Sequence, residues 1–211
     1  MRVITTSGQG TVAVKPDITV ITFYVSEHSK SYADSIRLAE ESTVNIRNTI
    51  TEFQFDPTEL KSRSFSVEPV TRLSNSIKSI VGYQAIHTLS IALKQSREML
   101  NSLLTKLHER LKNTEIRLSF HSSSIEELKG EALKKAVELA MKRASLIAVS
   151  ANIRLGKIID IKYAGDNGYR YNDNSIPLFS RGESSKDLQL NIEPAGMSVS
   201  DSVTITWEIA E

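Results

Sequence analysis

Hydrophobic and polar positions follow two different periods in the N-terminal half of the chain. Residues 18–26 are rich in Val, Ile, Thr, Phe and Tyr, and residues 83–93 alternate apolar and polar positions as a β-strand does. Between these two strands, residues 31–53 carry apolar side chains at spacings of three and four, which is the period of one helix face. The stripe consists of Tyr32, Ile36, Ala39, Thr43, Ile46, Ile50 and Phe53. This pattern predicts a helix that packs on a core.

Two further strands are predicted in this half. Residues 2–14 form the first, and Gly8 and Gly10 within it indicate a bulge or a close approach by another backbone. Residues 60–69 form the other, and the polar residues 71–79 are expected to form a hairpin loop.

The C-terminal half is dominated by a long alanine-rich helix, predicted over residues 124–151. A leucine stripe over residues 100–111 predicts a shorter helix before it. The sequence Ser124-Ile125-Glu126-Glu127 is a capping box, and Asn152 suits a left-handed C-terminal cap. Small side chains recur every four residues along the long helix at Ala132, Ala136, Ala140, Ala144 and Ala148. Such a face allows the helix to lie close to a sheet or to another helix.

The order of the elements predicts the fold class. Strands are expected at residues 115–121, 156–163 and 199–209, and residues 165–187 are expected to form a long irregular loop. The resulting order is ββα, ββα and βα, followed by the loop and a last strand. It favours an α+β fold in which helices pack on an antiparallel or mixed sheet of ββα units. We expect a single domain over residues 1–211, with possible substructure at 1–95 and 96–211.

Composition and charge exclude several classes of function. The 211 residues are 40% hydrophobic and 24% charged, as in an ordinary globular protein. The formal net charge of +1 provides no global field for nucleic acid or an anionic membrane, so we expect no nucleic-acid partner. The absence of cysteine excludes disulfides, thiolate metal sites and a cysteine nucleophile.

The sequence also contains no recognisable targeting signal. It lacks the apolar segment and cleavage site of a signal peptide, and no run approaches the about 18 apolar residues of a membrane span. We therefore expect no integral membrane segment. The expected location is cytoplasmic as the sequence stands, or periplasmic if a signal peptide has been removed.

Several short motifs follow one another along nearly the whole chain outside residues 165–187. They are Ser7-Gly8-Gln9-Gly10, Lys15-Pro16-Asp17, the strand from Ser62 to Pro69, Gly82-Tyr83-Gln84-Ala85, Ser119-Phe120, the alanine-rich helix with Leu155-Gly156, and Pro194-Ala195-Gly196. Their order and spacing resemble the SIMPL-domain family, which is also catalogued as a domain of unknown function. The family includes bacterial periplasmic immunogenic proteins and proteins described as oxidative-stress defence proteins.

The resemblance implies an α+β fold and a homo-oligomer, since some members of the family form large ring-like or channel-like assemblies. It carries over no catalytic residue, because none is established for the family. A role in oxidative stress follows from the family's labels alone.

Candidate chemistry is sparse. Gly8-Gln9-Gly10 lacks the adjacent helix N-terminus of a phosphate cradle. The four histidines share no metal-ligand spacing, and Asp166-Asn167-Gly168 lacks the remaining ligands of a calcium loop. His87 is a candidate pocket residue because it lies on the apolar face of its strand, although a hydrogen-bonded core histidine fits the same pattern better. We predict no metal, no cofactor and no catalytic residue.

The one aromatic–basic cluster lies in the long loop and consists of Tyr169, Arg170 and Tyr171. It is a candidate interaction site, since such side chains stack on a base or fill a pocket of a partner. A solvated loop without a partner is the alternative.

We therefore expect a protein that is not an enzyme and acts as an oligomeric structural or interaction protein. One alternative is a module that binds a small molecule near His87 or under residues 165–187. Another is an unrecognised hydrolase, which requires a serine, a histidine and a carboxylate within hydrogen-bond reach.

Overall fold

A computed structural model describes residues 2–74, 77–94, 97–111, 113–163, 176–179 and 196–210. The described chain forms two compact units, and each is described here by itself. Unit 1 contains residues 2–16, 122–163 and 196–210, and unit 2 contains residues 17–121 and 176–179 within the described ranges. The units therefore interleave along the chain, and they do not divide at residue 95.

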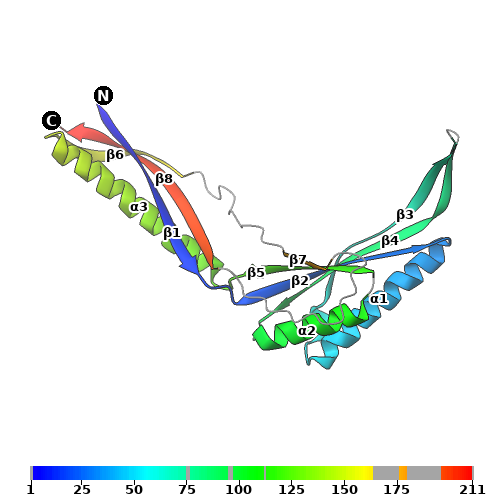
Figure 1. The fold of residues 1–211 in the computed structure, drawn as a ribbon. Helices are drawn as coiled ribbons and strands as arrows, with labels where there is room; N and C mark the ends of the chain where they lie inside the picture. The colour runs from blue at the N-terminus through cyan, green and yellow to red at the C-terminus, as the bar shows by residue number, and fades with distance from the viewer. Residues whose placement is uncertain are drawn as a thin grey trace. The chain divides into compact units, whose positions relative to one another are not determined.

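Unit 1 is a three-stranded antiparallel sheet with one long helix packed on one of its faces (Figure 1). In spatial order its strands are β1 (Val3–Val14), β8 (Met197–Ala210) and β6 (Arg154–Lys162), and its helix is α3 (Ile125–Ser150). Strands β1 and β8 pair without interruption from Val3 opposite Glu208 to Val14 opposite Met197. The sheet of this unit therefore forms only when β1, from the N-terminal part of the chain, pairs with β8, from the C-terminal part.

Helix α3 lies so close to β1 that the two backbones are almost in contact. A Cβ atom added to Gly8 would lie 1.9 Å from the carbonyl oxygen of Ala136, and one added to Gly10 would lie 1.9 Å from that of Ala132. Two residues before Gly8, on the same face of the strand, the hydroxyl of Thr6 donates a hydrogen bond of 2.7 Å to the carbonyl of Ala140. Two strand residues rise about 6.8 Å and four helix residues about 6.0 Å, so alternate strand positions meet successive alanines.

The face of the unit 1 sheet that points away from α3 is covered with hydroxyl groups. Three cross-strand pairs of Ser and Thr hydroxyls join β1 to β8 at 2.9–3.1 Å, namely Thr5–Thr206, Ser7–Thr204 and Thr11–Ser200. Because hydroxyls bond both to each other and to water, this face is stable without a covering layer.

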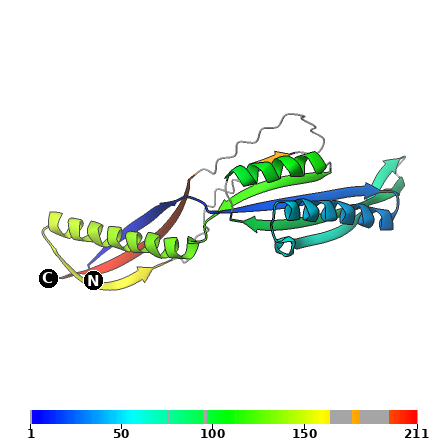
Figure 2. The same ribbon diagram turned by 90° about the horizontal axis from the view of Figure 1, so that it is seen from below.

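Unit 2 is a five-stranded antiparallel sheet with two helices on one face (Figures 1 and 2). In spatial order its strands are β3 (Lys61–Ser74), β4 (Ile77–Leu93), β2 (Ile18–Ser29), β5 (Thr114–His121) and β7 (Ile176–Phe179). The helices are α1 (Tyr32–Glu52) and α2 (Arg97–Arg110), and a short 3-10 helix, Pro57–Glu59, precedes β3. The central strand β2 contributes Ile21, Phe23 and Val25 to the core, all fully buried.

The helices supply the other half of this core from the stripes that the sequence predicts. From α1 come Ala39, Ile46 and Ile50, and from α2 and the residue after it come Leu100, Leu103, Leu104, Leu107 and Leu111. The predicted α+β class is confirmed, and so is the left-handed cap at Asn152, whose φ is 52°. The close backbone approach at Gly8 and Gly10 is confirmed as well, whereas the strand has no bulge there.

Several local expectations are corrected. Residues 71–74 and 77–79 belong to β3 and β4, so the expected loop over 71–79 is wrong; its polar side chains mark exposed strands. Residues 176–179 form β7, inside the segment expected to be an irregular loop. Ser124 precedes α3 without a side-chain hydrogen bond, so the capping box does not form. Finally, β1 and β2 lie in different sheets, so the first ββα unit contains no hairpin.

Replacement of the strand glycines tests the packing of α3. We expect Gly8→Ala or Gly10→Ala to lower the free energy of unfolding by at least about 2 kcal/mol, because the added methyl group meets the helix backbone. The matched control is Gly130→Ala within α3, where a Cβ meets nothing within 4 Å. That variant should gain about 1 kcal/mol from helix propensity. Urea unfolding measures all three, and equal effects of the three substitutions would contradict the packing argument.

Candidate functional site

His87 lies between the sheet of unit 2 and helix α1, as the sequence suggests, and both of its ring nitrogens have partners. Its Nδ1 lies 3.0 Å from the hydroxyl of Thr43 on α1, and its Nε2 lies 2.9 Å from the hydroxyl of Ser62 on β3. The ring also packs against Phe65 in a T-shaped arrangement, with centroids 5.2 Å apart. The imidazole therefore joins one helix and two strands.

The hydrogen bonds place a proton on Nδ1 of this histidine. The hydroxyl of Thr43 donates to the carbonyl of Ala39 at 2.8 Å, so it accepts a hydrogen bond from Nδ1–H of His87. When the ring is neutral, the remaining nitrogen, Nε2, accepts from the hydroxyl of Ser62. Burial lowers the pKa of His87 below its ordinary value of 6.5, and the positive charge of Arg47 lowers it further. The lowered pKa favours the uncharged ring, and the hydroxyl of Ser62 can donate to its free Nε2.

The Ser62–His87 pair also bears on the hydrolase alternative. A serine within 2.9 Å of an imidazole is the first half of a catalytic triad. In a triad the second ring nitrogen donates to a carboxylate, but here it bonds to the hydroxyl of Thr43. A hydroxyl orients the ring but supplies no negative charge to stabilise an imidazolium ion. At His87 the arrangement is therefore that of a structural histidine held from both sides.

A second polar cluster, which sequence reasoning missed, surrounds Glu27 on β2. This carboxylate is buried, with 8% of the residue exposed. One carboxylate oxygen accepts from the hydroxyl of Ser42 at 2.8 Å, and the other accepts from the side-chain amide of Asn113 at 3.0 Å. The only signal in the sequence was an acidic residue at an inward position of a strand. The cluster joins α1 and the residue directly before β5 to the central strand, since Ser42 lies on α1 and Asn113 directly precedes β5.

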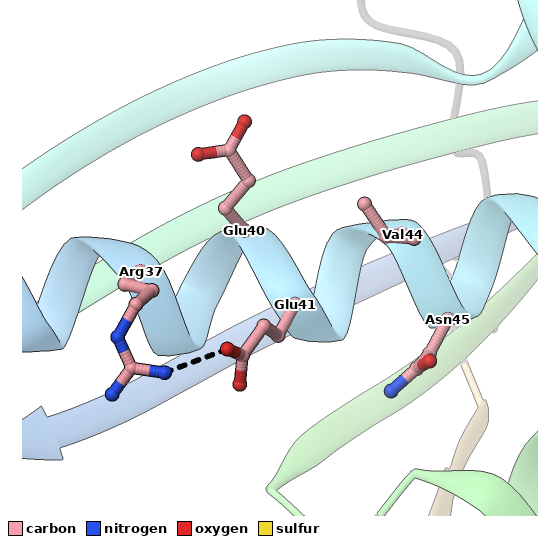
Figure 3. Close-up of a pocket in the computed structure, with 5 residues that line it drawn as sticks. All are labelled: Arg37, Glu40, Glu41, Val44 and Asn45. Atoms are coloured by element: carbon pink, nitrogen blue, oxygen red, sulfur yellow. Dashed lines mark hydrogen bonds and ion pairs between the residues drawn. The ribbon is translucent and has the colours of Figure 1, made fainter.

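The surface hollow drawn in Figure 3 lies on the exposed side of α1. Its lining residues are Arg37, Glu40, Glu41, Val44 and Asn45, which all come from this one helix. Arg37 forms ion pairs with Glu41 at 2.6 Å and with Asp34 at 3.4 Å, both between exposed side chains. Exposed pairs of this kind contribute little to stability or to ligand binding. His87 is not among the lining residues, so this hollow is not the pocket that the sequence suggested.

The other candidates from the sequence add no further site within the described residues. Tyr169, Arg170 and Tyr171 lie outside the described residues. Within the described ranges, no group of three or more His, Asp or Glu side chains is arranged to hold a metal ion. None of the helices in these ranges is both long and apolar enough to cross a membrane.

The succession of strands and helices in two antiparallel sheets, with the glycine-rich first strand against an alanine-rich helix, defines an α+β protein. A family model for SIMPL, described as a protein of unknown function (DUF541), matches residues 4–207. The chain therefore belongs to the SIMPL family, as its sequence motifs suggested.

Curated relatives carry no functional description in their names. The "Uncharacterized protein YggE" of Escherichia coli strain K12 is 22% identical over 207 residues, which cover 98% of this chain and 82% of that protein. The protein of the same name from Edwardsiella ictaluri is 23% identical over 165 residues, or 78% of this chain and 69% of the relative. These similarities extend over both structural units.

The pH dependence of unfolding tests the neutral state of His87. Because the fold lowers the pKa of His87, the unfolded chain binds the proton more readily below its ordinary value of 6.5. The contribution of this group is therefore fully present above pH 6.5 and is lost as the pH falls through the lowered pKa of the folded state. We expect His87→Asn, which keeps a donor near Nδ1 but does not titrate, to flatten this decline.

The measurement is urea unfolding at a series of pH values. His121 provides the matched control, because burial lowers its pKa as well. His121→Asn should remove a separate part of the decline, and the double variant should remove both parts. A decline that is unchanged in His87→Asn would show that His87 is charged or exposed in the folded protein.

Proposed function

We propose that this protein is a self-associating structural or interaction protein that performs no catalysis. The observation that carries the proposal is a group of exposed apolar side chains in unit 1, which we call the association surface. It consists of Met141, Leu146, Ile147 and Val149 on the C-terminal half of α3, Ile158, Ile159 and Ile161 on β6, and Tyr163 directly after β6. Their exposed fractions range from 38% to 78%. Exposed groups of apolar side chains on this scale mark interaction sites.

The position of β6 supports association as well. This strand pairs with β8 on one side, and no other strand in the described ranges pairs with its second side. Irregular register near Ile158 twists the strand, and Lys157 and Lys162 flank its apolar residues. Twists and lysines of this kind prevent uncontrolled pairing of sheet edges, so a specific contact is favoured over aggregation.

A second copy of the chain is the proposed occupant of this surface. The net charge of +1 does not oppose contact between like chains, and the family resemblance implies homo-oligomers. In a two-fold contact the same surface serves both copies, so one apolar patch on each is sufficient. A stress-related role rests on the family resemblance alone.

Light scattering after size-exclusion chromatography tests the proposal at several protein concentrations. We expect a mass above that of one chain, and we expect Leu146→Ser with Val149→Ser to shift the protein towards the monomer. Both side chains are largely exposed, at 65% and 78%, so the substitutions should leave the fold intact. Loss of two apolar contact residues should raise the dissociation constant at least about tenfold.

Val44→Ser on the exposed side of α1 is the control, because it also replaces an exposed apolar side chain by serine, on a helix of unit 2. It should leave the mass unchanged. A wild-type protein that remains a monomer at all concentrations would refute the proposal.

A further inference from the structure

The end of the hairpin formed by β3 and β4 is a two-stranded ribbon. Strand β2 pairs with β4 only as far as Ser29 opposite Tyr83. Beyond that point β4 pairs with β3 alone, from Val70 opposite Gly82 to Ser74 opposite Ile77. Figure 1 shows this end of the hairpin extending past the end of β2. An isolated pair of strands has no second layer against which to bury side chains.

Apolar side chains are nevertheless concentrated on this ribbon. Leu73 is 72% exposed, Ile80 is 58% exposed and Val81 is 37% exposed. The register shifts between Val70 and Thr71, which leaves Val81 without a partner across the hairpin. Aliphatic side chains on such a ribbon contribute nothing to the core of the unit. They can be buried only against the surface of another molecule or assembly.

The charges of the ribbon are all positive. Arg72 and Lys78 lie in its two strands, and the sequence from Val70 to Gly82 contains no acidic residue. Lys78 lies directly opposite Leu73 in the register, so a cation and an aliphatic side chain are cross-strand neighbours. We call these five residues, Arg72, Leu73, Lys78, Ile80 and Val81, the hairpin tip.

We propose that the hairpin tip docks on the surface of a lipid bilayer that contains anionic lipids. Aliphatic side chains enter the boundary between headgroups and acyl chains, while neighbouring lysine and arginine side chains remain at the level of the anionic headgroups. The tip provides both components on two adjacent strands, β3 and β4. Although the net charge of the whole protein is close to zero, the attraction is local, because charges act over about 8 Å at physiological ionic strength.

Two other occupants fit the tip less well. A symmetric contact with a second copy would place Arg72 and Lys78 near their own counterparts, and like charges at an interface are unfavourable. Single-stranded nucleic acid is bound by aromatic side chains that stack on bases, and the sequence from Val70 to Gly82 contains none. An anionic lipid surface satisfies both the cations and the aliphatic groups.

Co-sedimentation with vesicles tests this proposal on the full chain. One set of vesicles contains phosphatidylcholine alone, and the other contains equal parts of phosphatidylcholine and phosphatidylglycerol. We expect binding to the second set, weakened by added salt, and much weaker binding to the first. Arg72→Gln with Lys78→Gln should weaken binding about thirtyfold, and Leu73→Ser with Ile80→Ser at least about tenfold.

The control is Lys134→Gln with Lys142→Gln, which removes the same charge from the exposed side of α3 in unit 1. It should bind as the wild type does. Equal weakening by this control, or no binding of the wild type to anionic vesicles at low salt, would overturn the assignment. Thermal unfolding shows whether the tip variants are folded.

Two further readouts separate the lipid surface from the other occupants. If the tip variants change the mass measured by light scattering but not the binding to vesicles, the tip contacts a second copy and the lipid proposal is wrong. If they lose binding to a single-stranded oligonucleotide instead, the partner is nucleic acid. The tip lies on unit 2 and the association surface on unit 1, so failure of one proposal leaves the other open to its own test.

Discussion

The contact between the backbones of β1 and α3 constrains both the sequence and the topology of unit 1. Glycine at the inward positions 8 and 10 is required for a helix carbonyl to approach the strand this closely, and the buried alanines at every fourth position of the helix keep its facing side chains small. Because the side chains at this contact are small, little apolar area is buried there, and Ile4, Val203, Ile205 and Trp207 supply the larger hydrophobic surface nearby. Close approach fixes the position of the helix, and the larger residues provide most of the free energy of burial.

This contact also explains why the sheet pairing was not predictable from hydrophobic periods. A period of two identifies β1 and β2 as strands, but it does not state which strand each one pairs with. Short connections usually join neighbouring strands, yet here β1 pairs with β8, and Val3 lies opposite Glu208. Helix α3 requires a strand with glycines at alternate positions, and β1 provides them whereas β2 carries Phe23 and Val25 at its inward positions. Pairing of strands so far apart in the sequence carries a larger loop-closure entropy than the more local hairpin of β3 and β4.

The candidate site was predictable in position but not in detail. The alternation of residues 83–93 placed His87 on the face towards a helix, and the structure places it against α1. Its partners Ser62 and Thr43 were not predictable, since hydrogen bonds between distant elements depend on register and helix rotation. Thr43 belongs to the apolar stripe that predicts α1, and its hydroxyl bonds both to the helix backbone and to the imidazole. For the same reason the role of Glu27 was not predictable, because its partners Ser42 and Asn113 are distant in the sequence.

The two sides of unit 1 differ in a way that bears on association. The sheet face with the paired hydroxyls of β1 and β8 needs no partner, because its polar groups bond to one another and to water. The last turns of α3 and strand β6 instead carry large aliphatic side chains, although serine or lysine at those positions would satisfy the same local structure. Propensity and core packing do not account for Leu146 or Val149, since both point to solvent within the unit. The fold of unit 1 does not require these two side chains, so the proposed association depends on them and can be tested by replacing them without disturbing the core.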